Sequence, residues 1–198
     1  MTNIINGILN YMISQKVIED NEKERDFYRY GIEITISSIC NIVLVVILGI
    51  ISKHFFLSCI YLSEFILIRS VSGGLHAKTY VGCNAIMCIS YLLLLCLFIC
   101  FSEKITPAGL IISALLSIIP MSVYSPCDNP HKRIKTEKKL KFKILSIALT
   151  TIFCIIGLVL FLNNFSVGFW IIMVCDLVSL FLFIASKKAE EHKISDNS

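Results

Sequence analysis

Apolar residues divide the chain into long hydrophobic runs separated by short polar breaks. Six runs lie approximately at residues 34–52, 54–68, 81–101, 105–124, 142–162 and 165–186. A helix needs about 20 predominantly apolar residues to cross the hydrocarbon core of a bilayer, and most of these runs have that length. The pattern predicts an all-α, polytopic membrane protein with a bundle of six transmembrane helices.

The second run, residues 54–68, is short and contains the acidic residue Glu64. Such a segment can be tilted, partly re-entrant or buried against its neighbours instead of crossing in the ordinary way. The positive charges favour a full crossing. Lys and Arg are concentrated in the N-terminal segment, after the second run, after the fourth run and in the C-terminal tail. Because positive residues near spans remain in the cytoplasm, this alternation predicts that both termini and the 69–80 loop are cytoplasmic.

The N-terminal segment has apolar residues at helical spacing, followed by charged residues. The apolar positions are Ile4, Ile5, Ile8, Leu9, Met12 and Ile13. Such an amphipathic helix could lie in the membrane interface or form a dimer contact. The segment lacks the continuous apolar core of a signal peptide, so we expect it to remain on the mature chain. We expect one integral membrane domain at residues 1–198, with the interfacial helix in 1–31, the bundle in 32–186 and a cytoplasmic tail in 187–198.

Composition supports the membrane class. Hydrophobic residues make up 56% of the chain and charged residues only 16%, and the mean hydropathy is +0.80. A soluble core of this size could not bury that much apolar surface. Seven of the nine cysteines lie inside apolar runs, where a thiol behaves as a small hydrophobe. The sequence contains no CxxC pair and no Cys/His cluster with zinc spacing, and we expect no metal, cofactor or nucleic acid partner.

One polar passage, "RSVSGGLHAKTYVGCNAIM" at residues 69–87, carries candidate chemistry. A cysteine attacks carbonyls as the thiolate, and a nearby imidazole can take the thiol proton. His76 and Cys83 are seven residues apart, which is about two helical turns, and two turns of a straight helix rise about 10.8 Å. Contact therefore requires His76 to lie on a loop that folds back towards Cys83, and Gly73 and Gly74 would permit that bend. The competing interpretation is a chance pairing of a loop histidine with a helix-start cysteine.

Charged residues near this passage have two interpretations each. Arg69 could anchor the topology or support an oxyanion or a substrate carboxylate. Glu64 could orient His76, or pair with Arg69 or Lys78 in a buried contact. Cys127 matches no catalytic position, so we treat it as a bystander.

The passage resembles the AgrB family, the bacterial membrane cysteine peptidases that process AgrD-type precursors of quorum-sensing peptides. The matching residues are Arg69, the pair Gly73 and Gly74, His76, Ala77 and Cys83, and the loop "SPCDNPHKRI" at 125–134 is similar to the basic, proline-containing loop of that family. The resemblance implies that His76 and Cys83 are the catalytic pair. It also implies a homodimer in the bacterial cell membrane.

The resemblance implies a two-step reaction on the cytoplasmic side. Cys83 would cleave the C-terminal part of the propeptide and hold the rest as a thioester, which a precursor cysteine or serine would displace to close a thiolactone or lactone. The precursors of this family carry an acidic tail, for which the basic loop is a suitable partner. Its candidate residues are Lys132, Arg133, Lys135, Lys138 and Lys139. The same loop could instead set topology beside anionic lipid.

Two other function classes compete with the peptidase. A non-enzymatic small membrane transporter or sensor would use the acids placed in or beside the apolar runs, Glu33, Glu64 and Asp176. A membrane thiol oxidoreductase would need a cysteine pair near one face, which the scattered apolar cysteines fit poorly.

Overall fold

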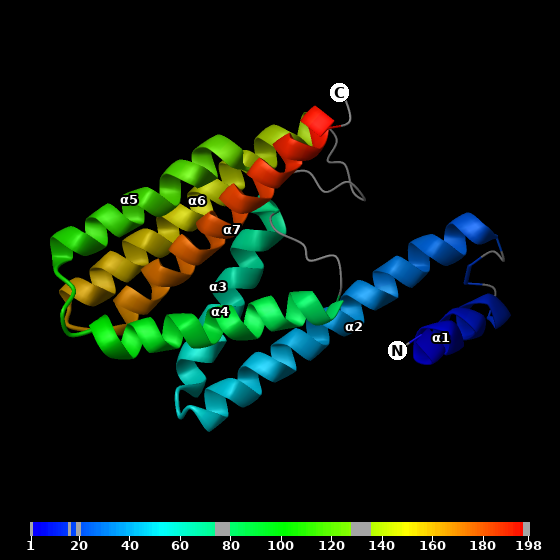
Figure 1. Ribbon diagram of the computed structural model, residues 1–198, viewed down its shortest axis with the longest axis horizontal. Coiled ribbons are helices and arrows are strands. Elements are labelled where there is room, and N and C mark those ends of the chain that lie inside the picture. Colours follow the sequence, from blue (N-terminus) through cyan, green and yellow to red (C-terminus); the bar gives the residue numbers. More distant parts are fainter. Residues whose placement is uncertain (1, 16, 19–20, 74–79, 128–135, 196–198) are drawn as a thin grey trace. The chain divides into compact units, whose positions relative to one another are not determined.

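The computed structural model describes residues 2–15, 17–18, 21–73, 80–127 and 136–195, and every regular element in them is an α-helix. The helices are α1 (Thr2–Ser14), α2 (Glu22–Ile51), α3 (Phe55–Ser72), α4 (Tyr80–Phe101), α5 (Pro107–Tyr124), α6 (Thr136–Leu162) and α7 (Val167–Ser195) (Figure 1). Within the described residues, six helices, α2 to α7, are long and apolar enough to cross a membrane. The predicted all-α class and the six spans are confirmed.

Four helices extend well beyond the apolar runs that predicted them, three of them through segments rich in charged residues. Helix α2 begins at Glu22, α6 begins at Thr136 and α7 ends at Ser195, so their charged ends are helical as well. Hydropathy marks only the part of a helix that lies in lipid, whereas Glu, Lys and Arg are good helix formers in water. Helix α3 continues to Ser72 and reaches 18 residues, which corresponds to about 27 Å of rise. That length is close to the thickness of the hydrocarbon core.

The contacts divide the chain into two units, residues 1–44 and residues 45–198, with α2 running from one into the other. In the first unit, Ile5 and Leu9 of α1 and Ile18 after it are buried, and Tyr28, Ile32 and Ile36 of α2 pack against them. At the rim, the guanidinium groups of Arg25 and Arg29 donate to the side-chain oxygens of Asn10 and Asn6, at 3.3 and 2.8 Å. The apolar face of α1 is therefore largely used in packing against α2.

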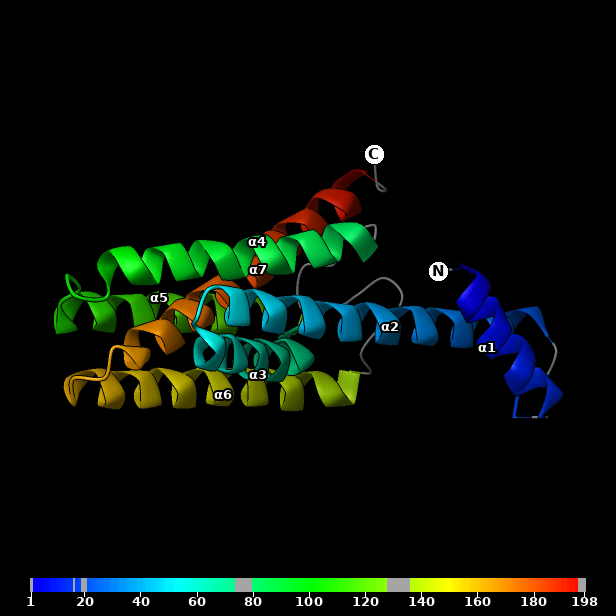
Figure 2. The same cartoon turned by 90° about the horizontal axis from the view of Figure 1, so that it is seen from below.

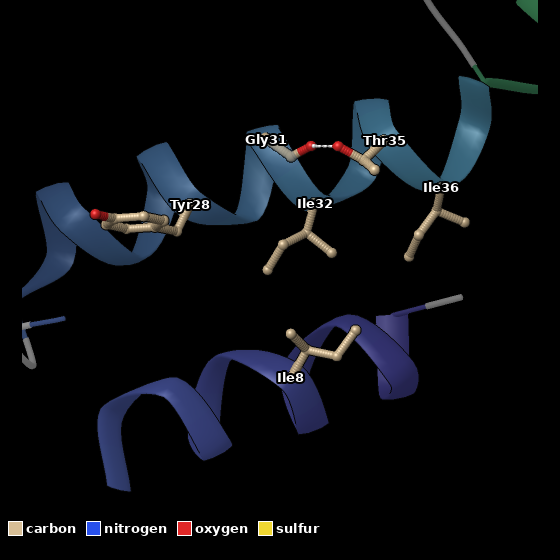
Figure 3. A pocket seen from close by; sticks show the side chains of 6 residues that line it. All are labelled: Ile8, Tyr28, Gly31, Ile32, Thr35 and Ile36. Carbon is tan, nitrogen blue, oxygen red and sulfur yellow. Dashed lines mark hydrogen bonds between the residues drawn. The ribbon is translucent and has the colours of Figure 1, made fainter. Parts of the chain in front are cut away.

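A shallow apolar groove runs along this pair of helices. It has a volume of about 370 Å³ and is lined by Ile8, Tyr28, Gly31, Ile32, Thr35 and Ile36 (Figure 3). The Thr35 hydroxyl, which could have made the groove polar, donates to the Gly31 carbonyl at 2.9 Å. Ile8 and Tyr11 remain exposed, so the predicted interfacial position or dimer contact of α1 would use these side chains.

In the second unit, α7 is the central helix and contacts α3, α4, α5 and α6. Figures 1 and 2 show α5, α6 and α7 as neighbouring helices, and each of the three contacts the other two. Trp170, Ile172, Val174 and Leu182 of α7 are fully buried. By contrast, α5 and α6 expose apolar side chains along their outer faces, including Ile112, Leu116, Ile152 and Ile155. Apolar side chains both inside and outside a helical bundle are typical of a membrane protein, because lipid covers the outer ones.

Aromatic contacts hold α3 and α4 to this centre. The Tyr61 ring of α3 lies 5.5 Å from the Tyr91 ring of α4 between centroids, and Tyr91 lies 6.0 Å from the Trp170 ring of α7. The Tyr61 hydroxyl also hydrogen-bonds the Ser90 hydroxyl at 2.8 Å. The first half of α3 and the middle of α4 are therefore packed together against α7.

Candidate active site at the α3 and α4 ends

Cys83 lies in the first turn of α4, where it is the fourth residue of the helix and half-buried. The first turn of a helix carries amide N–H groups without intrahelical partners and a partial positive charge. These groups can stabilise negative charge that develops during a reaction at this position. The thiol is thus placed at the edge of a span, neither in the packed centre nor facing lipid in the middle of the helix.

Arg69 belongs to the last turn of α3. Its guanidinium carbon lies 5.3 Å from the centroid of the Phe65 ring, one turn earlier on the same helix. The guanidinium is also close enough to Cys83 and to the Tyr61 hydroxyl for their charges to interact. The structure therefore brings together a cation and a thiol that are fourteen positions apart in the sequence.

Gly73 ends α3 in a conformation that needs glycine. Its N–H donates to the Arg69 carbonyl at 3.1 Å, and its φ is +73° with ψ at −154°. A β-carbon at this position would lie 2.5 Å from the carbonyl oxygen of Cys127. Both the positive φ and the lack of space exclude larger side chains. The turn that ends α3 at Gly73 is therefore constrained to glycine, directly before the segment that carries His76 in the sequence.

Cys127, which sequence analysis set aside, contributes its backbone to this turn. Its N–H donates to the Ser72 carbonyl at 3.0 Å, and its side chain packs against the central core of the second unit. Two residues earlier, the Ser125 hydroxyl bonds the Ser146 hydroxyl of α6 at 2.5 Å. The segment after α5 thus fixes the end of α3. No local sequence pattern relates residues 72 and 127, which is why sequence analysis missed the contact.

Several predicted site residues lie outside the described residues: His76, Gly74, Lys78, Lys132, Arg133 and Lys135. The predicted contact between His76 and Cys83 therefore stays a prediction. Of the predicted tail-binding lysines, Lys138 is exposed near the start of α6 and Lys139 beside it is half-buried. Among the described residues, no group of three or more His, Cys, Asp and Glu side chains is arranged to hold a metal ion.

Glu64 is directed away from this site. It is fully buried, and its Oε1 accepts a hydrogen bond from the Cys175 thiol of α7 at 3.0 Å. Its Oε2 has no hydrogen-bond partner. Nearby on α7, the Asp176 carboxyl accepts from the Ser113 hydroxyl of α5. In the described part of the chain, Glu64 bonds neither Arg69 nor Cys83. Its observed partner, Cys175, lies in the centre of the bundle.

Comparison with known proteins identifies the family. The sequence model of accessory gene regulator B (AgrB) matches residues 5–184. A protein of Clostridium perfringens strain SM101, named as AgrB-like, is 28% identical over 188 residues, covering 89% of this chain and 86% of its own length. An AgrB-like protein of Clostridium beijerinckii is 27% identical over 168 residues, covering 79% and 73% of the two chains. No solved structure matches. The chain, a multi-pass membrane protein by its six spans, therefore belongs to the accessory gene regulator B family.

Proposed function

We propose that this protein is a membrane cysteine endopeptidase that cleaves an AgrD-type propeptide and promotes cyclisation of the product. Family membership implies involvement in the processing of autoinducing peptides, and the proposal assigns the chemistry to Cys83 and His76. The observation that carries it is the position of Cys83 in the first turn of α4, with the Arg69 guanidinium within electrostatic range. Half-burial leaves the sulfur accessible to a peptide from the polar side of the span.

In the first step His76 takes the proton of the Cys83 thiol, and the sulfur attacks the carbonyl carbon at the C-terminal edge of the future signal. A tetrahedral oxyanion forms. The C–N bond then breaks, the departing amine takes the proton from His76, and the N-terminal part of the precursor remains on Cys83 as a thioester. Arg69 supports the negative charge that passes from the sulfur to the oxyanion, because a fixed cation near developing charge lowers the barrier.

In the second step His76 takes the proton of a precursor cysteine thiol, the sulfur of that cysteine bonds to the thioester carbonyl carbon, and Cys83 leaves as the thiolate. The product is a thiolactone ring, and a serine in the same place would give a lactone. Water must be kept from the first thioester, since hydrolysis would release a linear peptide. A site at the edge of a bundle whose neighbouring side chains are apolar and aromatic is suited to exclude it.

The remaining parts of the proposal concern location and partners. The positive charges of the loops support an active site on the cytoplasmic side of the cell membrane. Basic residues from 132 to 139, of which Lys138 and Lys139 lie in the first turn of α6, would attract the acidic tail of the precursor. The protein would act as a homodimer. A transporter or sensor remains the second candidate, favoured by the fully buried carboxyl of Glu64.

Co-expression with the precursor tests the proposal, with precursor and product masses followed in membranes. Cys83→Ala should abolish cleavage and the covalent thioester. Cys88→Ala is the matched control, because Cys88 is also half-buried and lies on the same helix, and it should cleave at the wild-type rate. His76→Ala should behave as Cys83→Ala does. Cleavage at the wild-type rate in Cys83→Ala would eliminate the peptidase and leave the second candidate.

A further inference from the structure

The centre of the second unit holds polar side chains that the chemistry at Cys83 does not use. Glu64 of α3 accepts a hydrogen bond from the Cys175 thiol of α7, and the Cys154 thiol of α6 lies near this pair. Cys154 in turn lies 3.4 Å from the Ser117 hydroxyl of α5. A cluster of polar side chains thus gathers residues from four transmembrane helices. All four residues are at most 2% exposed even before lipid is considered.

Glu64 is the one member of this cluster with a carboxyl group, and that carboxyl is poorly hydrogen-bonded. One oxygen, Oε1, accepts from a thiol, which is a weak donor, and the other, Oε2, has no partner. An ionised carboxylate in such a place needs a cation or several strong donors, because a buried unpaired charge is very costly. A neutral carboxylic acid requires much less, since an unpartnered hydroxyl is cheaper to bury than an unpartnered charge.

The surrounding helices supply no such cation among the described residues. From α7 Glu64 meets Cys175, from α6 it meets Cys154, and Asp176 adds a second acid that is bound to Ser113 of α5. On α3 itself the nearest base is Arg69, whose guanidinium lies over the Phe65 ring and interacts with Cys83 and Tyr61. In the part of the chain that the structure describes, the titratable groups that act on Glu64 are therefore the thiols of Cys175 and Cys154, and no base bonds its carboxyl.

We propose that Glu64 is a proton-binding site within the bilayer, held as a neutral carboxylic acid by full burial, a single thiol donor and the absence of a partner for Oε2 among the described residues. The bound proton removes the charge that would otherwise separate α3 from α7. It thereby allows α3 to cross the membrane in tight contact with the central helix. This site is independent of the proposed peptidase reaction, and it holds whether or not Cys83 is the nucleophile.

Infrared spectroscopy of the full-length protein in lipid vesicles at pH 7 tests the proposal. The C=O stretch of a protonated carboxylic acid is separate from the bands of a carboxylate. The difference between wild type and Glu64→Gln should show one protonated-acid band that shifts in D₂O. Glu103→Gln is the matched control, because Glu103 is an exposed carboxyl between α4 and α5, and it should leave that band unchanged.

A second variant keeps the test decisive should Glu64→Gln fail to fold. Cys175→Ala retains Glu64 but removes the thiol that donates to Oε1, so the acid band should move to higher frequency. If the difference between wild type and Glu64→Gln contains only carboxylate bands, Glu64 is ionised and the proposal is overturned. An acid band that neither Glu64→Gln nor Cys175→Ala alters would overturn it as well.

Discussion

Two cysteines in this protein each lie beside a charged or titratable side chain of α3, but they differ in burial and in whether that side chain is a base or an acid. Cys83 is half-buried at the start of α4 and interacts with the cation Arg69. Cys175 is fully buried in the first half of α7 and donates to the carboxyl of Glu64. A half-buried thiol at a helix end can be reached by a substrate, whereas a fully buried thiol in the centre of the bundle cannot. The same residue type is thus suited to catalysis in one place and to packing in the other.

The largest expected difference between the two cysteines is their reaction with a water-soluble alkylating reagent. Cys83 should be alkylated with complete loss of precursor cleavage, while Cys175 should react at least about 100-fold more slowly because its side chain is fully buried. Peptide mass spectrometry after timed alkylation measures both rates in one sample. Equal alkylation rates at Cys83 and Cys175 would show that the two thiols do not differ in accessibility. Cleavage that survives full alkylation of Cys83 would contradict its catalytic role.

The next largest effect is expected for Arg69. Arg69→Gln removes the cation beside Cys83 and should lower kcat/KM by about 100-fold, mainly through kcat, as losing one oxyanion-stabilising group does. Arg69→Lys keeps a charge without the planar guanidinium and should recover part of the rate. Cleavage kinetics with a synthetic precursor in proteoliposomes separate kcat from KM. If Arg69 only sets topology, Arg69→Lys will be fully active and Arg69→Gln will fail by losing correctly inserted protein.

Sequence analysis located the helices better than their ends. Each apolar run of bilayer length became a helix, because the need to bury backbone polar groups in lipid leaves few alternatives. The charged extensions of α2 to Glu22 and α7 to Ser195 were missed, since hydropathy does not distinguish a helix in water from a loop. Helix propensity of those segments, rich in Glu and Lys, was the signal available there.

The candidate site was predictable where its residues are close in sequence. Arg69, Gly73 and Cys83 lie within one short passage, so their proximity follows from a turn between two spans. The contacts that fix this turn were not predictable. The bond from Cys127 to Ser72 joins residues 55 positions apart, and the bond from Cys175 to Glu64 joins residues 111 positions apart. Such contacts depend on how α5 and α7 pack, and a single sequence carries no periodic signal for helix pairing.

A smaller effect is expected at the turn itself. Gly73→Ala must adopt a positive φ and meet the Cys127 carbonyl oxygen at 2.5 Å, so it should destabilise the protein by about 1–2 kcal/mol. Gly31→Ala is the matched control, because a β-carbon there would meet nothing within 4 Å. In the interior of α2 that change should stabilise the helix by about 0.5–1 kcal/mol. Thermal unfolding in lipid nanodiscs measures both, and a neutral Gly73→Ala would show that the turn is not constrained.

The smallest effect on stability is expected for Glu64→Gln. This variant tests whether Cys175 lies beside a neutral acid, in contrast to Cys83 beside the cation Arg69. A glutamine has nearly the shape of a neutral glutamic acid, and its amide oxygen can accept from the Cys175 thiol as Oε1 does. The free energy of unfolding in nanodiscs should therefore change by less than about 1 kcal/mol, and cleavage should continue. If Glu64 were ionised and paired, removing its charge would leave a buried cation alone and cost about 3–5 kcal/mol. A loss of that size would make Glu64 an ion-pair partner and would place both cysteines of the comparison beside fixed charges.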